Sequence, residues 1–62
     1  MIRYYPLKWT GFHFVVDGKD CYIQDWQGCE IYLGQYPVRS YLLVMEFANE
    51  IIRTEYAKYI IA

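Results

Sequence analysis

The stretch FVVDGKD, residues 14–20, joins two runs of strand-forming residues through an Asp-Gly pair. Asp-Gly between such runs is the preferred sequence of a two-residue type I′ hairpin turn, in which both central residues take a positive φ. We therefore predict a turn at Asp17 and Gly18, a register that pairs Phe14 with Cys21. Strand alternation then puts the apolar side chains of both strands on one face, namely Phe12, Phe14, Val16, Cys21 and Ile23.

The next connection, DWQGCE at residues 25–30, sets the register of a further strand. A two-residue turn at Gln27 and Gly28 would send Ile31 and Leu33 to the wrong face, because a one-residue slip exchanges the two faces of a strand. A three-residue loop with Gly28 in the left-handed position of a bulge keeps them on the apolar face. That register pairs Asp25 with Cys29, Ile23 with Ile31, and Cys21 with Leu33.

The residues before and after these hairpins extend the fold. Residues 2–9 are compatible with a first strand, and Pro6, which lacks an amide donor, places that strand at the sheet edge or breaks it. Pro37 is acceptable in the first turn of a helix and is predicted to open one. The chain is therefore predicted to be a single α+β domain spanning residues 1–62. Its antiparallel meander has three or four strands over about residues 2–34, and one long helix over about 38–61 packs on a sheet face.

The predicted helix has more apolar surface than one sheet can cover. One stripe at helical spacing is expected to pack on the sheet and contains Tyr41, Met45, Ala48, Ile52, Tyr56 and Tyr59. The opposite side is polar, with Arg39, Glu46, Asn49, Glu50 and Arg53. Between them lies a second apolar stripe. A helix of about 24 residues is also about 36 Å long, whereas six-residue strands span about 20 Å.

We expect this surplus surface to be covered by a second copy in a two-fold homodimer, the commonest closed assembly. The predicted dimer interface comprises Leu43, Val44, Phe47, Ile51, Tyr59 and Ile60. The alternative is a helix that begins near Tyr41, bends, and buries both stripes within its own chain.

The other face of the sheet carries the candidate partner-binding residues. The predicted registers align His13, Tyr22 and Tyr32 in one cross-strand row, with Gln24 beside it and Trp26 at the loop tip. Tyr is also simply a good strand former, so a solvated row without function remains an alternative.

Composition and motifs argue against most chemistry. Six Lys and Arg residues are spread singly over a chain of net charge −1, so no basic cluster favours nucleic acid. His13 and Cys21 fall on opposite faces, which leaves no thiolate–imidazole pair, and Asp25 and Glu30 are interpreted as solvated turn residues. No cofactor, metal site or membrane segment is expected, and the default location is the cytoplasm.

These observations favour a small non-enzymatic protein-binding module, a homodimeric accessory inhibitor or adaptor of a larger protein, of the kind that phages direct against host systems. The alternative function is a single-stranded nucleic-acid-binding protein that stacks bases on the aromatic sheet face. Acidic residues beside that face disfavour the alternative.

Overall fold

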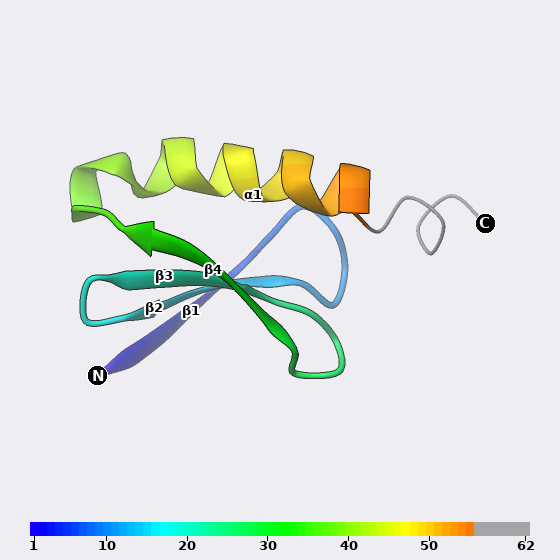
Figure 1. Ribbon diagram of the computed structural model, residues 1–62, viewed down its shortest axis with the longest axis horizontal. Coiled ribbons are helices and arrows are strands. Elements are labelled where there is room, and N and C mark those ends of the chain that lie inside the picture. Colours follow the sequence, from blue (N-terminus) through cyan, green and yellow to red (C-terminus); the bar gives the residue numbers. More distant parts are fainter. Residues whose placement is uncertain (56–62) are drawn as a thin grey trace.

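The computed structural model of the chain, described here over residues 1–55, is a four-stranded antiparallel sheet with one helix on one face (Figure 1). The strands run in chain order across the sheet, as the predicted meander requires. Their bounds are Ile2–Pro6 for β1, His13–Asp17 for β2, Asp20–Gln24 for β3 and Glu30–Gln35 for β4. A short 3-10 helix, η1 (Val38–Ser40), leads from Pro37 into the α-helix α1 (Tyr41–Glu55). The part of the predicted helix beyond Glu55, with Tyr56, Tyr59 and Ile60, lies outside the described residues.

The first hairpin turns one residue later than predicted. Its central residues are Gly18 and Lys19, and Asp17 pairs with Asp20. A turn at Asp17 and Gly18 would need a positive φ at Asp17, whereas the observed turn needs one only at Gly18, where φ is +66°. Each residue of β2 consequently pairs two positions further along β3. Because a shift of two residues preserves alternation, the apolar face is the predicted one although its pairs differ.

The second hairpin follows the predicted loop and departs from it only near the end of β4. The Asp25 amide donates to the Cys29 carbonyl over 2.9 Å, Gly28 has a φ of +88°, and Ile23 pairs with Ile31. Further along, an extra residue in β4 forms a bulge, so that Cys21 pairs with Gly34 and not with Leu33 as predicted.

The bulge gives β4 an irregular outer edge. Gly34 has a φ of +120°, and a Cβ atom there would lie 3.4 Å from the ring of Tyr36. The Tyr36 hydroxyl donates to the Leu33 carbonyl over 3.1 Å. A glycine is required at this point because an L side chain disfavours this φ and would crowd the ring that folds back over the strand.

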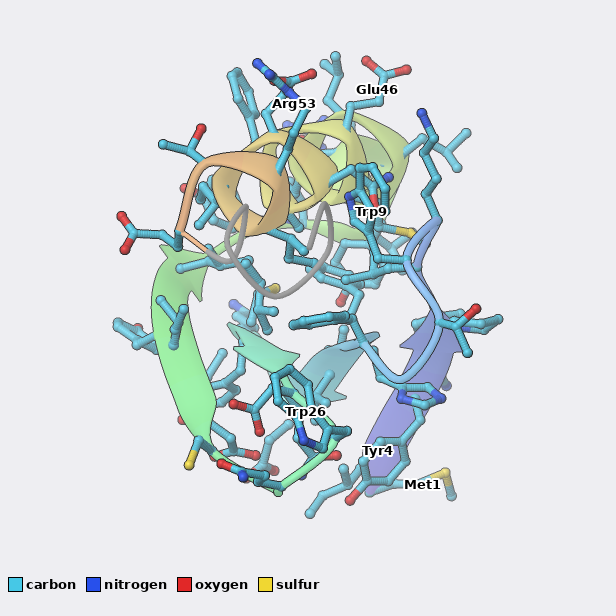
Figure 2. The ribbon with its side chains drawn as sticks, turned by 90° about the vertical axis from the view of Figure 1, so that its right-hand side faces the viewer. Met1, Tyr4, Trp9, Trp26, Glu46 and Arg53 are labelled. Carbon is cyan, nitrogen blue, oxygen red and sulfur yellow. The ribbon has the colours of Figure 1, made fainter. Side chains whose placement is uncertain are left out.

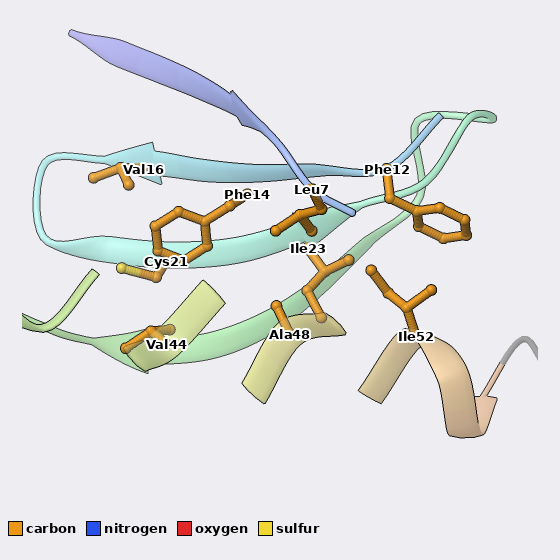
Figure 3. Packing of buried hydrophobic residues seen from close by; sticks show 9 residues of the cluster. All are labelled: Leu7, Phe12, Phe14, Val16, Cys21, Ile23, Val44, Ala48 and Ile52. Carbon is orange, nitrogen blue, oxygen red and sulfur yellow. The ribbon is translucent and has the colours of Figure 1, made fainter. Parts of the chain in front are cut away.

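The core lies between α1 and the sheet (Figure 3). The helix contributes positions spaced by four, which fall on one line along its surface. Val44 is one of them and is only 6% exposed, so its assignment to a dimer surface is wrong. Ile51 is half-buried against the core. The buried cluster consists of Leu7, Phe12, Phe14, Val16, Cys21, Ile23, Val44, Ala48 and Ile52.

The loop between β1 and β2 is tied to the side of α1 by Asn49. The Lys8 amide donates to the Asn49 side-chain oxygen over 3.0 Å, and the Trp9 indole nitrogen donates to the Asn49 carbonyl over 3.1 Å. Trp9 accordingly lies beside the helix, whereas Glu46 and Arg53 project away from the sheet (Figure 2). Asn49 is therefore a half-buried clamp and not the solvated residue that the helical pattern predicted.

The flank of α1 opposite the Asn49 clamp is apolar and open to solvent. Leu43 is 63% exposed and Phe47 is 67% exposed, and with Glu46 and Glu50 they line a shallow hollow of about 170 Å³. Leu42, about two turns before Asn49, is exposed on the clamp side of α1. The alternative of a helix that begins near Tyr41 is correct about the start of α1, but the described helix does not bury both stripes.

Candidate functional site

The candidate site is the face of the sheet turned away from α1, which we call the outer face. Its central row runs across all four strands through Tyr4, Val15, Tyr22 and Tyr32. The predicted pairing of Tyr22 with Tyr32 is present. His13 was predicted in this row, but the later turn of the first hairpin moves it one row along, opposite Gln24, and places Val15 next to Tyr22.

The rings of this row form a preorganised surface. The Tyr22 and Tyr32 ring centroids lie 5.2 Å apart with an interplanar angle of 56°. At the other end of the row, Tyr4 packs edge-on against His13, with centroids 6.5 Å apart. Val15 is 2% exposed and pairs with Tyr4 on one side and Tyr22 on the other, while Tyr4 and Tyr32 remain more than half exposed. The row is thus a small apolar cluster with accessible tyrosine rings.

Asp20 organises one side of the outer face. Its Oδ1 atom accepts from the Tyr32 hydroxyl over 2.9 Å and from the Gln35 amide nitrogen over 3.1 Å. This hydrogen bond, followed by burial and the negative charge of Asp20, raises the pKa of Tyr32. Burial, followed by the charges of Asp20, Asp17 and Glu30, raises the pKa of Tyr22. Both tyrosines therefore stay neutral hydrogen-bonding groups at ordinary pH.

Trp26 lies at the end of the sheet, in the loop between β3 and β4. It is 52% exposed, and its ring packs edge-on against the buried Phe12 with a centroid distance of 5.5 Å. Its predicted position at the loop tip is therefore correct, but one face of the indole belongs to the edge of the core. Figure 2 shows Trp26 at the end of the sheet that faces the viewer, below α1.

Asp25 has a structural role that the sequence interpretation missed. The side chain is 8% exposed, and its Oδ1 atom accepts from the amides of Gln27 and Cys29, each over 2.9 Å. Such a side-chain-to-backbone turn is a common use of aspartate, and the Asp-x-x-Gly spacing was the available signal. The interpretation of Asp25 as solvated is wrong, whereas Glu30 is exposed as expected.

The remaining reactive groups are dispersed. Cys21 is fully buried, which raises the pKa of its thiol, and His13 lies on the other face as predicted. Within residues 1–55, no three His, Cys, Asp or Glu side chains gather in a way that could hold a metal ion. The same part of the chain contains no helix with the length and apolar character to cross a membrane.

The candidate site is marked by its row of partly exposed tyrosine rings, in which Val15 separates Tyr4 from Tyr22 and Tyr32. Comparisons with protein-family models, with curated proteins and with solved structures find no match. The outer face therefore has to be interpreted from its own chemistry. It offers ring faces, tyrosine hydroxyls and carboxylate oxygens, a combination suited to noncovalent recognition.

Proposed function

We propose that this chain is a small non-enzymatic protein-binding module that engages a larger protein through the outer face and acts as its inhibitor or adaptor. One observation carries the proposal: Tyr4, Tyr22 and Tyr32 stand on the open side of the sheet, in one row with the buried Val15. The solvated face of an antiparallel sheet is ordinarily polar. Tyrosine supplies large contact area at low entropy cost, and protein interfaces are enriched in it.

The tyrosine rings are already held in place before any partner binds, which supports the proposal. Binding loses free energy whenever flexible side chains must be immobilised. Here the Tyr32 hydroxyl is already bonded to Asp20, and the Tyr22 and Tyr32 rings are already in contact. Within residues 1–55, no element packs on this side of the sheet, whereas α1 covers the other (Figure 1).

The test is a selection of random peptides displayed on phage against the folded chain, with counter-selection on a Tyr22→Ser, Tyr32→Ser double variant. Enriched peptides should bind the double variant about tenfold or more weakly, since aromatic anchors dominate interface energetics. Leu42→Ser is the matched control, because it removes an exposed apolar side chain from α1, on the other side of the sheet, and should leave binding unchanged. Circular dichroism should show the same fold in all three proteins.

Two outcomes would overturn the proposal that the outer face binds a protein. One is the absence of any peptide that prefers the chain over its double variant. The other is tight binding of a single-stranded oligonucleotide that Tyr22→Ser with Tyr32→Ser abolishes, because that result would assign the rings to base stacking.

We further propose that the chain is a homodimer through the exposed flank of α1. Of the interface predicted from the sequence, Leu43 and Phe47 have the exposed apolar area that such a contact needs. Apolar side chains this exposed on neighbouring helical turns are typical of interaction surfaces.

The dimer is tested by light scattering over a wide range of concentration. Phe47→Glu should give a folded monomer, because the position is exposed within one chain and a carboxylate is costly inside an apolar contact. Gln27→Glu, which adds the same charge in the exposed β3–β4 loop, should remain dimeric. A dimer that persists in Phe47→Glu, or a wild-type monomer at high concentration, would refute this interface.

A further inference from the structure

The outer face has one sign of charge. Strand alternation places three carboxylates on it, those of Asp17, Asp20 and Glu30. The cationic side chains of residues 1–55 belong elsewhere: Arg3 pairs with the core residue Val16, and the others lie in the first loop, the first turn and the helical segment. The rings are thus bordered by acids, and no strand residue on this face carries a positive charge.

These three carboxylates lack a counter-ion within the described chain. None makes an ion pair with another residue of 1–55, while Arg53 and Glu50 pair over 2.9 Å on the helix. Asp20 uses Oδ1 for its two hydrogen bonds and leaves its second oxygen available. The negative charges also act on the neighbouring ring, since they contribute to the raised pKa of Tyr22 after its burial.

The arrangement costs stability. Asp17 and Asp20 are directly opposite each other in the ladder, and like charges in that position are destabilising. A neutral residue at either position would remove the repulsion without disturbing the turn, whose special conformation is at Gly18. Retained local repulsion of this kind is expected where charge serves binding at the expense of stability.

We propose that the segment recognised by the outer face is cationic, with arginine or lysine side chains of a protein partner lying over the tyrosine rings and reaching Asp20 and Glu30. This inference rests on the proposed function and names its partner's chemistry. A guanidinium stacks favourably on a tyrosine face and donates charge-assisted hydrogen bonds to a carboxylate. Asp20 and the Tyr32 ring offer both partners side by side, joined by their own hydrogen bond.

The test uses a capped peptide of alternating arginine and valine, which in an extended conformation presents its arginines on one side. Two companion peptides carry glutamine or glutamate in place of arginine. Amide chemical shifts of the ¹⁵N-labelled chain are followed during each titration. The arginine peptide should shift Tyr22, Tyr32 and Asp20 and bind more weakly as salt is raised, because exposed charge pairs are screened. The glutamine peptide should bind at least about threefold more weakly, and the glutamate peptide not at all.

Matched variants separate a specific site from general attraction. Asp20→Asn with Glu30→Gln removes two charges, and the asparagine oxygen can still accept from Tyr32 and Gln35. It should weaken the arginine peptide about threefold to tenfold. Glu46→Gln removes a charge from the exposed side of α1 and should have no effect.

The outcomes distinguish the two proposals. Equal binding of the arginine and glutamine peptides at Tyr22 and Tyr32, or no loss in the Asp20→Asn, Glu30→Gln variant, would leave the face a protein-binding surface and overturn only the cationic partner. Shifts confined to α1, or no binding of the arginine peptide, would also overturn it. Failure of the random-peptide selection would instead remove the proposed function itself.

Discussion

Asp17 and Asp20 stand directly opposite each other at the closed end of the first hairpin, with both carboxylates on the outer face. We expect Asp17→Asn to raise the free energy of unfolding by about 0.2 to 1 kcal/mol, because it removes a like-charge cross-strand pair. Urea denaturation at low and high salt measures the change, which should shrink as salt screens the repulsion. Glu46→Gln is the control for net charge. A destabilised Asp17→Asn variant would mean that Asp17 makes a favourable interaction that outweighs the repulsion.

The contribution of the Asn49 hydrogen bond to stability can be measured by comparing two substitutions whose helix propensities predict the opposite order. Alanine is the better helix former, which alone would make Asn49→Ala more stable than Asn49→Asp by several tenths of a kcal/mol. Only aspartate can keep accepting from the Lys8 amide. We therefore expect Asn49→Asp to be the more stable of the two by about 1 kcal/mol in thermal or urea unfolding. The opposite order would show that the loop is held in place by Trp9 and apolar packing alone.

Alkaline pH should reveal the hydrogen bond between Tyr32 and Asp20. The pKa of Tyr32 is raised in the fold above its ordinary value of 10.0, so the folded state retains the phenolic proton more strongly than the unfolded chain. The resulting stabilisation is complete below about pH 10 and is lost as the pH rises from there through the folded pKa. Titration of the tyrosinate absorbance should show late ionisation of Tyr22 and Tyr32, and Tyr32→Phe should remove the Tyr32 component. Asp20→Asn should lower that component's pKa, and an unchanged titration would argue against the bond.

The two thiols should differ sharply in reactivity. Cys29 is exposed and should react with a maleimide in the native state, whereas Cys21 is buried and its thiol has a raised pKa. Mass spectrometry should therefore find one label per native chain and two after denaturation. Cys29→Ser should abolish native labelling. A second native label would indicate that the sheet opens locally around Cys21.

The strands and their faces could be predicted from sequence because the predicted hairpin register is wrong by two residues, and a shift of two leaves each side chain on the same face. Moving the first turn from Asp17 to Gly18 shifts every pair by two residues, which keeps Phe14 and Cys21 in the core. Pair-level predictions are less tolerant. His13 left the central row for that reason, and the bulge moves Leu33 out of its predicted pair with Cys21, because strand alternation alone does not specify a single inserted residue.

The helix shows a related limit. Its buried line runs through Val44, Ala48 and Ile52, so the predicted core stripe was rotated slightly from the true one. A hydrophobic pattern gives the direction of the core only to within the width of one side chain when the apolar arc is broad. Asn49 was assigned to solvent because its role is to bind a loop forty residues away in sequence, a contact that helical periodicity does not report.

The irregular edge of β4 bears on how the protein behaves when it is concentrated. Exposed strand edges are templates on which further chains add to a sheet and polymerise. Here the bulge and the Tyr36 hydroxyl on the Leu33 carbonyl interrupt one edge, and Pro6 closes the end of the strand at the other. We expect a sheet interrupted in this way to be a poorer template for added strands, which would keep the proposed binding face from becoming a nucleus for aggregation.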